Sequence, residues 1–131
     1  MKTGGILERS LSRENFYDTF LIMIGSNYPK EKRLTENERK VLIEFMKLKE
    51  EKFKYNRFGK IAKDRVQVSL DVTRPNLERY LKDLRSKGYI EKDMDNIHSL
   101  NKTLNRLLDI NELEINFKFK VNDWGHHQYL R

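Results

Sequence analysis

The side chains best suited to recognising another molecule follow Thr73, in the middle of the chain. Apolar residues recur there at helical spacing: Leu77, Tyr80, Leu81 and Leu84. This spacing predicts a helix over 73–87 that buries this stripe, and its exposed face carries Arg74, Asn76, Arg79, Lys82 and Arg85. Arg can bond guanine and Asn can bond adenine, each in bidentate fashion. The candidate base contacts are therefore Thr73, Arg74, Asn76 and Arg79. The alternative is an ordinary solvated face with internal ion pairs.

A second set of cations precedes this helix. The stretch over 47–65 holds eight Lys and Arg side chains against three acidic ones. Such a surplus suits sequence-independent contacts to phosphate, although a mobile charged loop would have the same composition. Together with two later lysines, the expected phosphate contacts are Lys52, Lys54, Arg57, Lys60, Lys63, Lys82 and Lys92.

Other kinds of site find little support in the residues. The chain has no cysteine, so it holds no thiolate nucleophile and no Cys-based zinc site. His126 and His127 are adjacent but have no third ligand nearby. Asp93-Met94-Asp95-Asn96 resembles the start of a calcium loop, but His98 and Leu104 stand where its Gly and bidentate Glu should be. No nucleophile motif or phosphate-cradling glycine loop is present. We therefore expect no metal, no cofactor and no enzyme activity.

The elements that position the 73–87 helix can be read from caps and periodicity. Thr35 begins a helix as its N-cap, and Glu38 completes a capping box. That helix is expected to run to about Lys49 and to bury Val41, Leu42, Phe45 and Met46. A further helix is expected over 63–70, with Ile61, Val66 and Leu70 on one buried face. Asp71-Val72 forms the turn, Gly88 ends the 73–87 helix, and Tyr89–Lys92 reads as a short strand.

These elements resemble the winged helix-turn-helix superfamily, especially the MarR-like bacterial regulators. The segment from Leu34 to Leu42 is similar to the Leu-Thr-x-x-Glu-x-x-Val-Leu helix that opens many such domains. The segment from Leu70 to Ile90 is similar to the family pattern that begins Leu-Gly-Val-Ser and ends Lys-Gly-Tyr-Ile. The resemblance covers about 60 of the 131 residues. It implies a DNA-binding domain with double-stranded DNA as partner.

Three positions depart from the family pattern. Asp71 replaces the usual turn glycine, although Asp tolerates a left-handed backbone better than most residues. Pro75 is unusual at the start of the reading helix. A helix expected over 100–108 falls where a short wing loop belongs, which puts a DNA-reading role for the wing in doubt.

Two apolar elements flank this region. Ser12 caps a predicted helix that Gly25 ends, and Leu113–Val121 alternates apolar and polar residues, as a half-buried strand does. Large bare apolar faces are rare on monomers, so we expect the first helix to contact another protein chain through Phe16, Phe20, Leu21 and Ile24. The expected fold is α+β and mostly helical: a winged helix-turn-helix with an added N-terminal helix and a C-terminal strand.

Charge divides the chain in the same way. Residues 30–92 carry 19 basic and 11 acidic groups, while the net charge of the whole chain is +7. We therefore expect an N-terminal helix in 1–29, the winged helix-turn-helix domain in 30–121 and a tail in 122–131. A surplus confined to the middle segment is typical of a polyanion-binding module.

Two functions remain open. The first is a cytoplasmic, dimeric DNA-binding regulator of transcription, with no membrane segment. The second is a structural or interaction protein, such as a phage virion or assembly component, in which the winged helix docks on protein. Small size, many lysines and flanking apolar elements resemble small phage-encoded proteins, and a fold does not fix a function.

Overall fold

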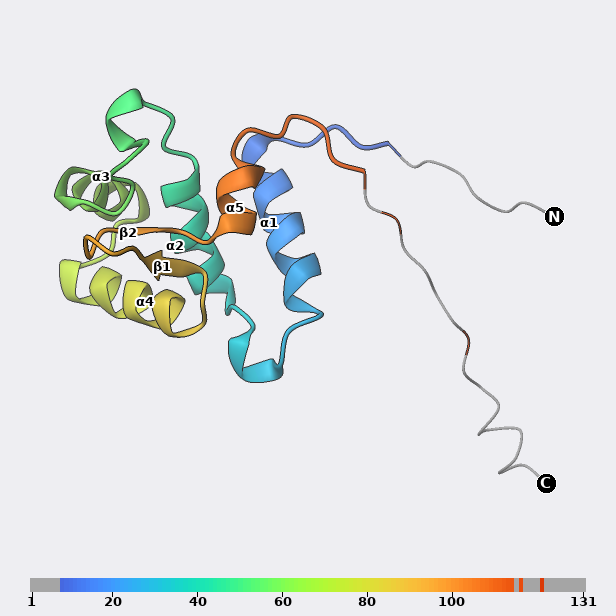
Figure 1. The fold of residues 1–131 in the computed structure, drawn as a ribbon, viewed down its shortest axis with the longest axis horizontal. Helices are drawn as coiled ribbons and strands as arrows, with labels where there is room; N and C mark the ends of the chain where they lie inside the picture. Colours follow the sequence, from blue (N-terminus) through green and yellow to red (C-terminus); the bar gives the residue numbers. More distant parts are fainter. Residues whose placement is uncertain (1–7, 115, 117–120, 122–131) are drawn as a thin grey trace, which may run out of the picture.

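The computed structural model describes residues 8–114, 116 and 121, and confirms the expected α+β, mostly helical class (Figure 1). The helices are α1 (Arg13–Gly25), α2 (Glu36–Met46), α3 (Lys60–Leu70), α4 (Arg74–Ser86) and α5 (Lys102–Leu107). The connectors contain two 3₁₀ turns, η1 (Lys30–Lys32) and η2 (Glu51–Phe53). Strands β1 (Ile90–Lys92) and β2 (His98–Leu100) form an antiparallel hairpin. Helix α2 is central, since it contacts α1, α3 and α4.

Three helices begin where the sequence places an N-cap. The hydroxyls of Ser12, Thr35 and Thr73 each accept a hydrogen bond from the backbone N–H three residues ahead, at 3.2–3.3 Å. At α2 the Glu38 carboxylate also accepts from the N–H of Thr35 at 2.8 Å, so the predicted capping box is confirmed. These bonds satisfy N–H groups that the first turn of a helix leaves without partners.

Helix α3 differs from its prediction. It begins at Lys60, three residues early, and α2 ends at Met46 rather than near Lys49. The prediction that Ile61 lies on the buried face was wrong, because Ile61 is 62% exposed while Ala62 and Val66 are buried. In a helix with 3.6 residues per turn, the i, i+4 row through Ala62 and Val66 excludes Ile61.

The hairpin was only half predicted. The strand was predicted from Tyr89, but β1 begins at Ile90. In the polar turn after β1, Oδ1 of Asp93 accepts from the N–H groups of Asp95 and Ile97 at 2.8 and 2.9 Å. Asn96 adopts φ 62° in that turn, a left-handed conformation in which Asn is enriched. The chain therefore folds straight back into β2.

Leu100, the first residue of the helix expected over 100–108, belongs to strand β2 instead. Leu100 lies opposite Ile90, and both side chains are buried. Helix α5 starts only at Lys102, where the Asn101 side chain accepts from the N–H of Leu104 at 2.9 Å. A three-residue strand is too short for alternation to be recognised in a sequence.

One hydrophobic core holds these elements together. Helix α1 belongs to it through Tyr17 and Leu21, and Arg13 joins the start of α1 to the segment after α5 by donating to the carbonyl of Ile110 at 2.6 Å. At the described positions of the strand expected over 113–121, which are 113, 114, 116 and 121, the structure has no strand. Leu113 and Val121 are exposed, so the predicted buried face is wrong at these two positions. The rest of this segment and the tail over 122–131 lie outside the described residues. No helix in the part of the chain described here is long and apolar enough to cross a membrane.

Candidate nucleic-acid interface

A tight turn joins α3 to α4 and sets the direction in which α4 projects. Asp71 has φ 52° and ψ 50°, in the left-handed region, which Asp tolerates better than most residues. The N–H groups of Asp71 and Val72 donate back to the carbonyls of Val68 and Gln67, both at 3.2 Å. This pattern satisfies the last carbonyls of α3, so α4 can begin only three residues after α3 ends.

Helix α4 separates an apolar stripe from a polar face. Leu77, Leu81 and Leu84 are buried, as predicted. The exposed face brings together Asn76, Arg79 and Lys82. Three of the predicted contact residues therefore point away from the body of the protein on one helix. The hydroxyl of Thr73 is occupied as the N-cap, so Thr73 sits at the base of this face but is committed to the helix.

Arg74 lies between α3 and α4 rather than on the open face. Its Nε donates to Oε1 of Gln67 at 2.9 Å, and its Nη2 forms an ion pair with Asp64. Lys63 makes a second link, because its Nζ lies 2.9 Å from Oε1 of Glu78. These contacts fix the two helices relative to one another. Arg74 can reach a base only after leaving its partners on α3.

Arg57 is turned inward, in contrast to its expected contact with phosphate. Its Nη1 donates to the carbonyls of Phe45 and Leu48 at 2.9 and 2.8 Å, where α2 ends. Burial holds the pKa of Arg57 below its ordinary value. The guanidinium joins the last turn of α2 to the residues that follow it, and it adds a donor to the Phe45 carbonyl, which also accepts from the Leu48 N–H at 3.3 Å. Its role here is therefore structural.

Of the remaining expected phosphate contacts, Lys52 and Lys54 lie on the connector before α3, and Lys60 is the first residue of α3. Lys52, Lys54 and Lys60 are exposed. In Figure 1 the connector that carries η2 lies above α3, whereas α4 lies below it. In this view the connector that carries η2 and helix α4 therefore lie on opposite sides of α3.

A further group of cations lies beside α4, and the sequence predicted only part of it. Lys92 of β1 is the direct cross-strand partner of His98 of β2. The pKa of the His98 imidazole lies below its ordinary value. Burial is the first cause, and the positive charges of Arg85, Lys92 and Lys63 lower it further. His98 could not be identified from the sequence because its strand was not predicted.

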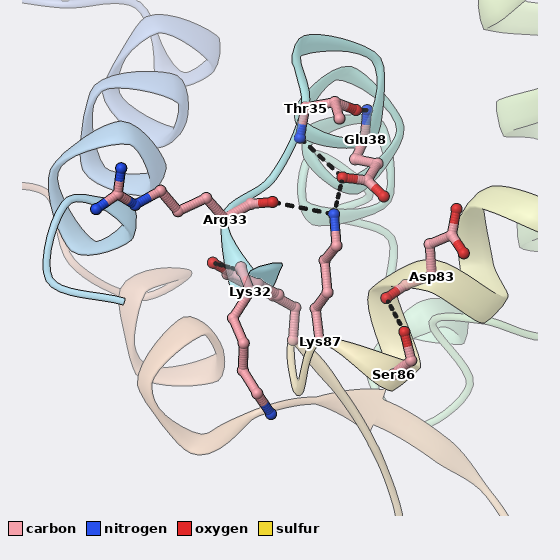
Figure 2. Close-up of polar contacts among 8 residues, drawn as sticks. Lys32, Arg33, Thr35, Glu38, Asp83, Ser86 and Lys87 are labelled. Atoms are coloured by element: carbon pink, nitrogen blue, oxygen red, sulfur yellow. Dashed lines mark hydrogen bonds and ion pairs between the residues drawn. The ribbon is translucent and has the colours of Figure 1, made fainter. Parts of the chain in front are cut away.

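The far end of α4 is anchored to α2 by a buried ion pair (Figure 2). Nζ of Lys87 lies 2.6 Å from Oε1 of Glu38 and donates to the carbonyl of Arg33 at 3.0 Å. Burial alone would raise the pKa of Glu38, but the hydrogen bonds from Lys87 and from the Thr35 N–H hold it below its ordinary value. The hydroxyl of Tyr89 also donates to the carbonyl of Lys32, at 3.1 Å. The C-terminal end of α4 is therefore held in place independently of its apolar stripe.

Helix α1 only partly fits the expected oligomer surface. Leu21 is 2% exposed and belongs to the core of its own chain, so it is not free to contact a partner. Phe16, Phe20 and Ile24 pack against that core but are only partly buried. Ile22, on another side of α1, is 50% exposed. Three of the four expected contacts thus retain accessible apolar surface.

Among the described residues, no three His, Asp or Glu side chains are grouped so that they could hold a metal ion. Comparison of the chain with protein-family models, with curated proteins and with solved structures gave no match.

Proposed function

We propose that this chain is a double-stranded DNA-binding protein of the winged helix-turn-helix kind, and that it regulates transcription in the cytoplasm. The order α2, α3, tight turn, α4 and hairpin is the order that such a domain requires. In this proposal α4 enters the major groove, which is wide enough to admit a helix.

The observation that carries the proposal is the outward face of α4. Asn76, Arg79 and Lys82 are exposed together, while the opposite stripe is buried and both ends of the helix are anchored. Asn and Arg are the residues that bond adenine and guanine edges in bidentate fashion. A rigid helix presenting them meets the requirement that base-reading groups be held in place.

A second candidate function is favoured by exposed apolar side chains. On α3, Ile61 and Val68 are 62% and 82% exposed, and they lie two turns apart on one face. With Ile22 on α1, they offer apolar surface that suits a protein partner. In this alternative the chain is an assembly component whose helices dock on other chains. For a dimeric regulator, a second copy would contact α1 instead, in a closed two-fold arrangement.

Binding of fluorescent duplex DNA separates the two functions. We expect binding to random duplex at low salt, with an affinity that falls steeply as salt rises, because bound phosphates release counterions. A chain that does not bind duplex DNA even at low salt is not a DNA-binding protein, and the assembly function would then stand.

Substitutions test the role of α4 within that assay. On a selected specific site, Asn76→Ala or Arg79→Ala should cost about 1–3 kcal/mol, and much less on random DNA. Lys60→Ala, which removes an expected phosphate contact, should weaken both complexes equally. Lys40→Ala, on exposed α2 surface, is the matched control and should change neither.

A further inference from the structure

Four basic side chains from four elements converge next to the outward face of α4. Lys92 and His98 are cross-strand partners. Lys92 is two residues after Ile90 on β1, and His98 is two residues before Leu100 on β2; Ile90 and Leu100 are themselves paired and buried. Side chains two residues apart on a strand share a face, so Lys92 and His98 lie on the face of the hairpin that packs on the helices.

Arg85 and Lys63 come to the same place from α4 and α3. Both contribute positive charge at His98. On α4, Arg85 is seven residues from Glu78, which pairs with Lys63, so Arg85 and Glu78 share the flank that faces α3 and the hairpin.

Negative charge at this cluster is limited. Glu78 is 2.9 Å from Lys63, and Asp93 acts on His98 from the hairpin turn. Asp93 is already engaged, since its Oδ1 accepts two backbone N–H groups. Within the described residues, Arg85 and Lys92 take part in no ion pair. Glu78 and Asp93 offset part of the positive charge, and Arg85 and Lys92 remain as the cations that can attract an anion.

We infer that Lys63, Arg85, Lys92 and His98 form a phosphate-binding site for DNA, at which binding of the duplex adds a proton to His98. The inference rests on the proposed function, because the site adjoins the face of α4 that is proposed to enter the groove. Arg and Lys hold phosphate as charge-assisted donors, and a protonated imidazole adds one more donor of the same kind.

The direction of the pH effect follows from linkage. In the free protein burial and then the neighbouring cations oppose protonation of His98, whereas a bound phosphate favours it. Binding therefore takes up a proton, and affinity rises as the pH falls through the pKa of His98 in the complex. The effect levels off below the pKa of the free protein, where His98 is charged in both states.

The test measures affinity for duplex DNA from pH 7.5 to 5.5 at constant salt. For the wild-type chain we expect about a five- to tenfold gain, which lies within the limit of about tenfold per pH unit that one linked proton sets. In His98→Asn the gain should fall to less than about twofold. The chain has two other histidines, so the double variant His126→Asn, His127→Asn is the matched control and should keep the wild-type gain.

The outcomes separate this inference from the proposed function. Binding that does not depend on pH, or a gain that persists in His98→Asn, overturns the proton-linked site and leaves DNA binding intact. No binding at any pH, at low salt, overturns both. If His98→Asn does not fold, NMR titration of the wild-type imidazole decides: a pKa that rises when DNA is added supports the site, and an unchanged pKa overturns it.

Discussion

Replacing Lys87 with Met would leave the Glu38 carboxylate buried without its cation. In the folded protein the Glu38 side chain is 5% exposed and that of Lys87 is 18% exposed, and Nζ of Lys87 lies 2.6 Å from Oε1 of Glu38. Met keeps most of the unbranched volume of Lys but has no charge. The substitution thus tests whether this ion pair holds the end of α4 on α2.

The size of the effect follows from burial. Removing one partner of a buried ion pair costs about 3–5 kcal/mol, because the other charge stays desolvated. Water reaches part of Lys87, so we expect Lys87→Met to lower the free energy of unfolding by about 2–3 kcal/mol. Glu38→Gln still offers an oxygen to the Thr35 N–H and to Lys87, and should cost only about 1–2 kcal/mol.

The pH dependence carries a sign that can be checked. The pKa of folded Glu38 is lowered from 4.5, so the carboxylate stabilises the fold above that unfolded value. The contribution is lost as the pH falls through the lower, folded pKa. The difference in stability between wild type and Glu38→Gln should therefore shrink in acid.

Urea unfolding followed by far-UV circular dichroism measures these changes. A double variant, Glu38→Gln with Lys87→Met, should be more stable than the sum of the two single losses, because no charge is left unpaired. If Lys87→Met stays within about 0.5 kcal/mol of wild type, the buried pair does not anchor α4 and this reasoning is refuted.

Three further predictions concern residues around the proposed interface. Arg57→Met should lower stability by about 1–3 kcal/mol, since the Leu48 carbonyl loses the Arg57 donor and the Phe45 carbonyl keeps only the longer bond from the Leu48 N–H. The salt dependence of DNA binding should not change, and a smaller slope would show that Arg57 does reach phosphate. Asp71→Gly should raise the free energy of unfolding by up to about 1 kcal/mol, and with it the thermal midpoint, because Gly adopts φ 52° without steric cost. A lower midpoint would contradict the left-handed turn. Burial, then the charges of Tyr28 and Glu38, raise the pKa of Tyr89 to about 12. The free energy of unfolding should therefore decline by about 2–3 kcal/mol as the pH rises from about 10 to 12. Urea unfolding of Tyr89→Phe over that range should show a smaller decline, and an equal decline would exclude Tyr89 as the cause.

Much of the region from α2 to α4 was predictable because its boundaries are set by local chemistry. Thr35 and Thr73 cap their helices through hydrogen bonds that close within three residues. Gly88, which ends α4, adopts φ 88°, a conformation that favours glycine. Such features depend on neighbours in the chain, so the sequence contains them in full.

The candidate site was harder to predict because it depends on contacts between elements. In the sequence, Arg57 and Arg74 cannot be distinguished from an exposed Arg. The packed structure shows that Arg57 donates to backbone carbonyls and that Arg74 is bound by side chains of α3. His98 could be assigned to the cationic cluster only once the Asp93 turn had placed β2 against β1. Charge composition predicts that an interface is basic but not which cations are free.

The most direct test of the central claim is an NMR titration of the isotope-labelled chain with duplex DNA at low salt, with backbone amide shifts followed by residue. DNA reading by α4 predicts that the largest shifts occur at Asn76, Arg79 and Lys82, with smaller ones at Lys92 and His98. Shifts confined to α1 or to the outer face of α3, or no shifts at all, would contradict it.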